Sequence, residues 1–114
     1  MINFDVVILG SGLAGLASAL KLAPNRKVAI VTKKTMLDGA SNWAQGGIAA
    51  VVDAFDTHES HVNDTMVAGA HLSDPNVTRL VVEKGAAGID WLIGQGVHFT
   101  KDKNTSSGLH LTME

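Results

Sequence analysis

Three glycines near the amino terminus have the spacing of a phosphate-binding turn. Gly10, Gly12 and Gly15 form a G-x-G-x-x-G motif, preceded by the apolar run VVIL and followed by a helix-forming stretch. Gly10 allows a tight turn, Gly12 the close approach of backbone to a pyrophosphate, and Gly15 the packing of a helix near a strand. The N-terminus of that helix offers free N–H groups and a partial positive charge to phosphate oxygens. The motif therefore predicts a dinucleotide site.

The elements that position this motif are a strand, a helix and a second strand. The sequence predicts a buried strand over residues 5–9, a helix over 13–22 and another strand over 28–31. Together they form a βαβ unit with parallel strands. A doubly wound sheet needs several such strands, and only two are evident. We expect an α/β, Rossmann-like domain that is incomplete in this chain, with residues 1–114 forming the N-terminal part of a longer protein.

The remaining residues are expected to be mainly helical. Apolar side chains recur at steps of three or four, which is typical of helices with one buried face. The expected features are a helix over 58–70, a helix start at Ser73-Asp74-Pro75, an apolar stripe over 77–93 divided at Gly85 or Gly88, and a short strand over 97–99. Residues 33–57 show no clear period.

Composition excludes several classes of protein. The net charge of −2 provides no basic field for nucleic acid or for an anionic membrane. The chain has no cysteine, so disulfides and thiolate metal sites are excluded. No stretch resembles a signal peptide or a bilayer-spanning segment. We expect a cytoplasmic enzyme without nucleic-acid or membrane partners.

Two further segments bear on the choice of dinucleotide. An acidic residue normally follows the second strand of an NAD site and holds the ribose, whereas this chain has Thr32-Lys33-Lys34 there. The next segment, residues 40–47, combines Ser, Asn and Gln side chains with a Gly-Gly pair. Such hydrogen-bond donors suit the polar edge of a flavin ring, whose charge grows on reduction.

Several longer motifs then point to one family. The segments WAQGGIAAV, HVNDTMVAGA, WLIGQGV and HLTME, with the glycine motif and the Thr-Lys pair, occur in this order along the chain. Over residues 4–114 the chain resembles the L-aspartate oxidase family of the succinate dehydrogenase/fumarate reductase flavoprotein superfamily. In that family Ser or Thr before Lys replaces the acidic residue, which accounts for Thr32 and Lys33.

The resemblance implies FAD as the cofactor. The residues expected to bind it are Gly10, Ser11, Gly12, Leu13, Ala14, Gly15, Thr32, Lys33, Ala40, Ser41, Asn42, Trp43, Ala44, Gln45, Gly46 and Gly47. Fumarate reductases and succinate dehydrogenases commonly place a flavin-linking His at the position of Ala40 and a Glu at that of Gln45. Without that His, the resemblance implies that FAD is held non-covalently.

The resemblance also implies an activity. Members of the family oxidise L-aspartate to iminoaspartate, pass the electrons to oxygen or fumarate, and so begin the route to quinolinate and NAD. Glu114 occupies the position of a Glu that orients aspartate, by meeting its ammonium group. The general base and the groups that hold the substrate carboxylates would lie beyond residue 114, so the chain alone is expected to be inactive.

Two other interpretations stay open at this point. The chain fits a fumarate reductase or succinate dehydrogenase flavoprotein subunit, or a truncated nucleotide-binding module without catalysis. A metal site is not expected, because His58 and His61 provide two ligands at helical spacing where zinc needs three or four.

Overall fold

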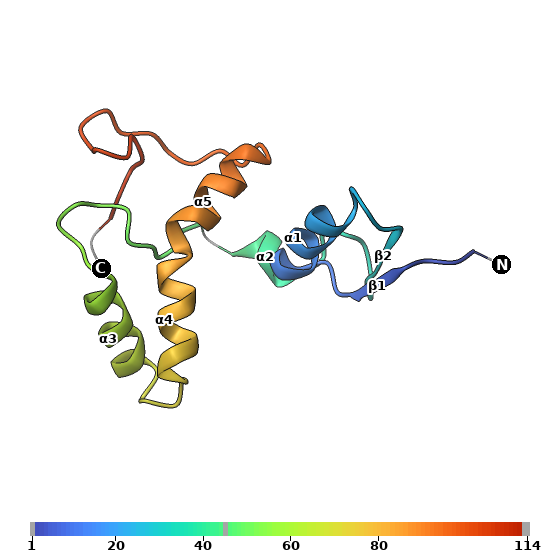
Figure 1. Cartoon of the computed structure of the whole chain (residues 1–114). Coiled ribbons are helices and arrows are strands. Elements are labelled where there is room, and N and C mark those ends of the chain that lie inside the picture. Colours follow the sequence, from blue (N-terminus) through green and yellow to red (C-terminus); the bar gives the residue numbers. More distant parts are fainter. Residues whose placement is uncertain (1, 45, 113–114) are drawn as a thin grey trace. The chain divides into compact units, whose positions relative to one another are not determined.

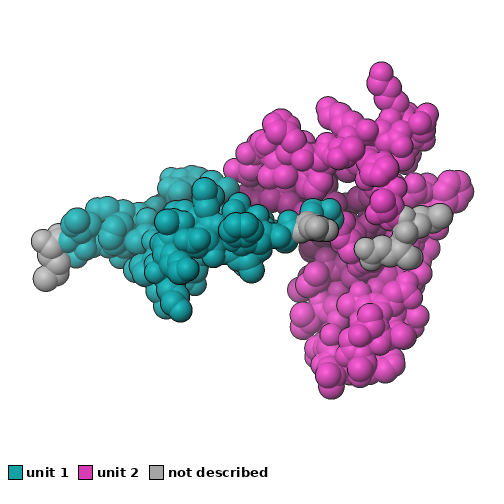
Figure 2. Space-filling view, turned by 180° about the vertical axis from the view of Figure 1, so that it is seen from behind, with its two compact units in different colours: residues 1–47 teal, residues 48–114 magenta. Residues whose placement is uncertain are grey.

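The computed structural model describes residues 2–44 and 46–112 of the chain (Figure 1). These residues fall into two compact units, Met1–Gly47 and Ile48–Glu114 (Figure 2). The first unit holds β1 (Val6–Leu9), α1 (Leu13–Leu22), β2 (Val28–Val31) and α2 (Ala40–Trp43). The second holds α3 (His58–Ala68), α4 (Pro75–Glu83) and α5 (Gly85–Gly94). The expected order of strand, helix, strand and then helices is confirmed.

The first unit is a βαβ unit with a two-stranded parallel sheet. β1 pairs with β2 from Val6 opposite Val28 to Leu9 opposite Val31, and α1 packs on both strands. The Asp5 carboxylate accepts a hydrogen bond from Lys27 N at 2.7 Å, and Asp5 N donates to Lys27 O at 2.9 Å. These bonds join the two strands at the start of the sheet. Because the strands are parallel, their carboxyl ends lie at the same edge of the sheet, where open α/β sheets bind ligands.

Gly15 allows α1 to lie close to the strand that precedes it. A Cβ built on Gly15 would overlap the Gly10 carbonyl oxygen and would lie 3.3 Å from Ile8 Cγ2. The contact with backbone cannot be relieved by a side-chain rotation. Hydrogen in place of a side chain is therefore required at this position.

Two helices of the second unit, α3 and α4, begin with a side-chain N-cap. Asp74 accepts hydrogen bonds from Asn76 N at 2.8 Å and Val77 N at 3.0 Å, and Pro75 occupies the first turn of α4. The Thr57 hydroxyl accepts from Ser60 N at 3.1 Å at the start of α3. Such caps satisfy N–H groups that have no partner inside the helix. The predicted helix start at residues 73–75 is confirmed.

Replacing the α4 cap is expected to destabilise the second unit. Asp74→Ala removes both accepted hydrogen bonds and should lower the free energy of unfolding by about 0.5–2 kcal/mol. Asp74→Asn keeps an oxygen acceptor and serves as the matched control. Urea unfolding followed by circular dichroism measures the difference, and equal stability of Asp74→Ala and Asp74→Asn would contradict the assigned role.

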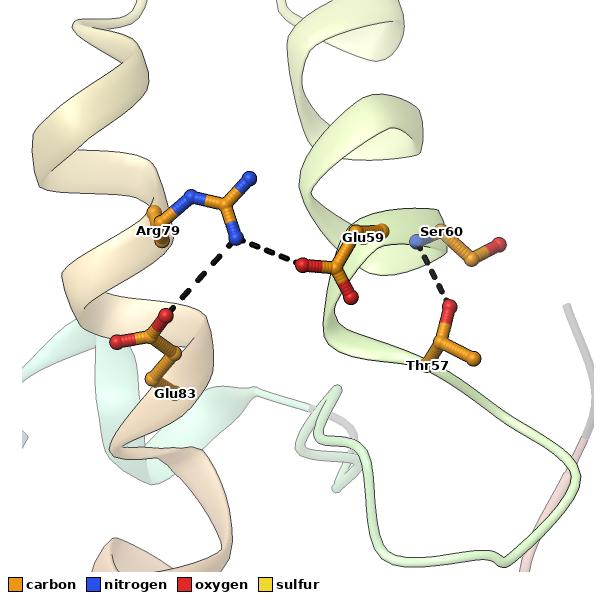
Figure 3. A network of polar contacts seen from close by, with 5 residues as sticks. All are labelled: Thr57, Glu59, Ser60, Arg79 and Glu83. Carbon is orange, nitrogen blue, oxygen red and sulfur yellow. Dashed lines mark hydrogen bonds and ion pairs between the residues drawn. The ribbon is translucent and has the colours of Figure 1, made fainter.

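An exposed ion-pair network joins α3 to α4, which lie side by side (Figures 1 and 3). Arg79 Nη1 donates to Glu59 Oε1 at 2.9 Å and lies 3.9 Å from Glu83 Oε1. The hydrogen bond from Arg79, together with one from the backbone, lowers the pKa of the Glu59 carboxyl below its ordinary value. Both partners are well exposed, so the stabilisation is small and screened by salt.

The lowered pKa of Glu59 gives this network a pH dependence. A carboxyl with a depressed folded-state pKa stabilises the fold above its unfolded-state pKa, and the stabilisation is lost as pH falls through the folded-state value. Glu59→Gln should therefore make stability in the acid range slightly less dependent on pH. Melting temperatures between pH 7 and pH 3 measure this. Glu83→Gln, a change at the longer 3.9 Å pair, is the control; an equal change in both variants would contradict the assignment to Glu59.

Two features differ from the sequence-based expectation. The strand predicted over 97–99 is wrong: among the described residues this segment has no strand pairing, and an isolated bridge joins Lys101 to Leu109 nearby. A turn at residues 95–96, with Gly96 at a φ of +91°, leads into this segment. A strand also requires a partner strand for its hydrogen bonds. Conversely, α2 is a short helix inside a segment that showed no helical period. The helix predicted over 58–70 ends at Ala68.

The second unit contains the buried apolar side chains of the described residues. Val62, Val82 and Ile89 lie one each on α3, α4 and α5. In the first unit the strand side chains are more exposed, and Leu9 at the end of β1 is 82% exposed. Within the described part of the chain, no helix is both long and apolar enough to cross a bilayer.

Candidate functional site: the glycine turn and its surroundings

The predicted turn lies directly between β1 and α1. Gly10 has a φ of +112°, a left-handed conformation that favours glycine, and its N–H donates to Val31 O at 2.8 Å. The turn is thus attached to the last residue of β2 while it redirects the chain into α1. The structure brings Gly10 and the residues that follow it to the ends of both strands.

The N-terminus of α1 has the chemistry of an anion site. Its N-cap is Gly12, which has no side chain to accept from the first turn, and that turn contains no acidic residue. The first N–H groups of a helix have no intrahelical partner and lie at the positive end of the helix dipole. Among the described residues, a Cβ built on Gly12 would meet only Ser41 Oγ, at 3.5 Å. This arrangement fits a pyrophosphate that approaches the backbone closely.

Ser11 connects the glycine turn to the residue after β2. Its side chain is buried, with 7% exposure, and its hydroxyl donates to Thr32 Oγ1 at 3.2 Å. This bond joins residues that are 21 positions apart and fixes the turn relative to β2. Of the predicted pair at the strand end, Thr32 thus lies beside the turn, whereas Lys33 is an exposed residue.

The start of α2 lies against the same turn. Leu13 N donates to Ser41 Oγ at 3.2 Å, and a Cβ built on Gly39 would lie 3.7 Å from Ser11 O. Between α1 and this segment is a small cavity of about 190 Å³. Its lining residues are Ser11, Leu13, Leu16, Met36, Leu37, Gly39, Ser41 and Asn42. Half of them are predicted cofactor residues.

Sequence reasoning missed the other half of this lining. Leu16 belongs to the apolar stripe of α1 and has the pattern of a core residue. Met36, Leu37 and Gly39 fall in a segment without periodicity, so no signal in the sequence distinguishes them from an ordinary loop. Their position becomes evident only when the chain folds back from β2 onto the glycine turn.

Several predicted cofactor residues do not line this cavity. The Trp43 side chain is 77% exposed, and Ala44 is exposed as well. A Cβ built on Gly46 or Gly47 would have no neighbouring atom of the described residues within 4 Å. Gln45 and Glu114 lie outside the described residues. The roles of all these residues stay predictions.

The second unit contains a larger open cavity of about 670 Å³ with different chemistry. Its wall is mostly apolar and includes the side chains of Asp53, His58 and Asp90. Two carboxylates disfavour a phosphate or a dicarboxylate by like-charge repulsion. Among the described residues, no three His, Asp or Glu side chains are placed to hold a metal ion. The glycine turn is therefore the better candidate for an anionic cofactor.

The parallel βαβ unit, the left-handed Gly10 and an α1 whose N-cap glycine has no side chain are together typical of a dinucleotide-binding α/β domain. A family profile described as "FAD binding domain" matches residues 5–113, and the chain belongs to this family. The cofactor of this family is FAD, so the FAD cofactor implied by the sequence motifs is confirmed.

The chain is similar to several L-aspartate oxidases. It is 57% identical over 112 residues to L-aspartate oxidase 1 of Ralstonia nicotianae, covering 98% of this chain and 21% of the relative. It is 47% identical to L-aspartate oxidase of Pseudomonas aeruginosa, covering 96% and 21%, and 45% identical to that of Acinetobacter baylyi, covering 98% and 20%. The chain spans about a fifth of the length of the curated relatives it matches.

Two solved structures share the fold. A mutant of E. coli quinol fumarate reductase FrdA superposes with a TM-score of 0.83 at 29% identity, covering 92% of this chain and 18% of that one. The Mycobacterium smegmatis Sdh1 complex in the apo form gives a TM-score of 0.81 at 29% identity, covering 90% and 18%. The chain thus has part of the fold of the succinate dehydrogenase/fumarate reductase flavoproteins.

Proposed function

We propose that this chain forms the pyrophosphate-binding part of an FAD-dependent L-aspartate oxidase. The observation that carries the proposal is the first turn of α1 behind the left-handed Gly10, which has a glycine N-cap and no acidic residue, on a chain 57% identical to an L-aspartate oxidase. The reaction proposed for the whole protein is oxidation of L-aspartate to iminoaspartate. Oxygen or fumarate takes the two electrons and two protons released from aspartate and becomes hydrogen peroxide or succinate.

The residues of this chain bind and position the cofactor. The N–H groups at the start of α1 bind the pyrophosphate, and the Ser11–Thr32 hydrogen bond keeps the glycine turn fixed for that purpose. In the complete protein the Ser, Asn and Gln side chains and the backbone of residues 40–47 would donate hydrogen bonds to the polar edge of the flavin. When bound, FAD supplies a two-electron acceptor for the hydride on the substrate Cα.

Two further proposals concern the chemistry around the flavin. The Ala40 methyl group has no atom able to bond covalently to the cofactor, so binding is non-covalent. Glu114 meets the aspartate ammonium with its carboxylate in the complete protein, a charge-assisted contact.

We further propose a cytoplasmic location without nucleic-acid or membrane partners, although one relative, 43% identical, is the chloroplastic enzyme of Arabidopsis thaliana.

A chimeric enzyme tests this function. This chain replaces the matching segment of L-aspartate oxidase 1 of Ralstonia nicotianae, and hydrogen peroxide formation from aspartate is measured. We expect a yellow, FAD-containing protein with aspartate-dependent turnover, and no turnover by the 114-residue chain alone. A folded chimera that lacks FAD or does not oxidise aspartate would contradict the proposal.

The fold similarity to fumarate reductase supports a second candidate, a flavoprotein subunit that reduces fumarate. The matched experiment inserts the same chain into E. coli quinol fumarate reductase FrdA. Because identity to that protein is 29% and identity to the oxidase is 57%, we expect the oxidase host to keep more of its activity. Full fumarate reduction by the second chimera, with loss of activity in the first, would favour the alternative.

A further inference from the structure

Met66 lies where α3 and α4 meet, and its sulfur contacts a buried hydroxyl. The side chain is half-buried on α3, which lies beside α4 (Figure 1). Thr78 on α4 is 8% exposed, and its Oγ1 lies 3.7 Å from Met66 Sδ and 2.9 Å from Asp74 O. A hydroxyl has one proton and donates to one of these acceptors at a time, and the thioether is the weaker acceptor. The Met66 sulfur therefore packs between the helices mainly as an apolar group.

The end of α3 that carries Met66 has an unfavourable backbone. Met66 O accepts a hydrogen bond from His71 N at 2.8 Å, which closes the turn after the helix. Within this turn Ala70 and His71 have φ values of +51° and +59°, a left-handed conformation that costs free energy for residues other than glycine. Helix ends open locally more readily than helix centres. A small solute therefore has a route to the half-buried sulfur.

We propose that Met66 is an oxidation site for hydrogen peroxide and that its sulfoxide loosens the contact between α3 and α4. In this step the sulfur attacks one oxygen of the peroxide, a sulfur–oxygen bond forms and the O–O bond breaks. The other oxygen leaves as water with both peroxide protons. The thioether is thus oxidised by two electrons, and the peroxide is reduced to water. The sulfoxide is polar where the thioether was apolar, which disrupts helix packing.

This proposal rests on the proposed function for the source of the oxidant. Hydrogen peroxide is the product of the proposed reaction when oxygen accepts the electrons from aspartate. Oxidation of Met66 would therefore link turnover with oxygen to a loss of stability in the second unit. Because methionine sulfoxide is reduced by methionine sulfoxide reductases, the link is reversible.

The test compares the methionines of the 114-residue chain, of which there are four. Met36, in the first unit, is 44% exposed and serves as the internal reference, whereas Met1 and Met113 lie outside the described residues. The chain is treated with hydrogen peroxide, and mass spectrometry measures the sulfoxide at each methionine and the amide hydrogen exchange of α3 and α4. The variants are Met66→Leu, which keeps an apolar side chain of similar volume without sulfur, and the matched control Met36→Leu.

In the wild-type chain we expect sulfoxide at Met36 and Met66, and amide exchange of α3 and α4 about tenfold faster once Met66 is oxidised. Met66→Leu should keep the slow exchange at the same peroxide dose. Met36→Leu should behave as the wild type does. Treatment of the oxidised wild-type chain with methionine sulfoxide reductases should restore the slow exchange, a result that does not depend on any variant.

The outcomes separate this proposal from the function on which it rests. Met66 left unoxidised at a dose that fully oxidises Met36 would overturn the site. Unchanged exchange in α3 and α4 after oxidation of Met66, equally fast exchange in treated Met66→Leu, or fast exchange that the reductases do not reverse would overturn its consequence. The peroxide here is added, so these results do not depend on aspartate oxidation. Failure of the chimeric enzyme to form peroxide would contradict the proposed function and leave the sensitivity of Met66 standing.

Discussion

Gly15→Ala is expected to destabilise the first unit by about 1–3 kcal/mol. It should also strongly weaken the binding of ADP, which serves as a probe for the pyrophosphate of FAD. The added Cβ overlaps the Gly10 carbonyl oxygen, a backbone atom, so α1 must move away from β1. That movement displaces Gly10 and Gly12, which form the proposed pyrophosphate site. Stability of the unit is measured by amide exchange of β1 and β2, and affinity by calorimetric titration with ADP.

Gly88→Ala is the matched control for this prediction. Gly88 also lies within a helix, α5, but a Cβ built there meets no atom within 4 Å in the part of the chain that the structure describes. Alanine has a higher helix propensity than glycine, so Gly88→Ala should stabilise the second unit by up to about 1 kcal/mol and leave ADP affinity unchanged. Similar behaviour of Gly15→Ala and Gly88→Ala would contradict the close packing assigned to Gly15.

Ile89→Ala is expected to have the largest effect on the second unit. The Ile89 side chain is 6% exposed, and the substitution removes three carbon atoms from one of the few buried apolar side chains of the described residues. Substitutions of this kind cost about 2–5 kcal/mol, and the lower end is expected where the core is small and next to an open cavity. Thermal unfolding followed by far-ultraviolet circular dichroism measures the loss.

The control for this second prediction lies one turn further along the same helix. Ile93 is 43% exposed, so Ile93→Ala makes the same chemical change with less burial lost. Its cost should be less than half that of Ile89→Ala, because the hydrophobic contribution follows the apolar area removed from water. Equal losses for Ile89→Ala and Ile93→Ala would show that the core does not centre on Ile89.

The local elements of this fold were predictable where the sequence has a clear period or a clear cap. The apolar run before Gly10 and the helical spacing after it predicted β1 and α1, and Asp74 with Pro75 predicted the start of α4. The predicted strand at 97–99 failed because strand formation depends on a partner elsewhere in the chain, which an apolar triplet does not specify.

The candidate site was predictable in its residue types and less so in its contacts. The glycine motif predicts the turn, since each glycine has a local conformational or packing reason. The hydrogen bonds from Ser11 to Thr32 and from Leu13 to Ser41 join residues 21 and 28 positions apart. No periodicity or local propensity specifies such pairs. They follow from the parallel strand register, which brings the end of β2 and the segment after it to the glycine turn.

We propose that the glycine turn of this chain binds the pyrophosphate of FAD. The most direct measurement is a titration of the isotope-labelled chain with FAD, followed by the backbone amide NMR signals. We predict saturable shifts of the Gly12, Leu13 and Ala14 amides, with little change in α3, α4 and α5. Absence of saturable shifts at the glycine turn, or shifts confined to the helices of the second unit, would contradict the claim.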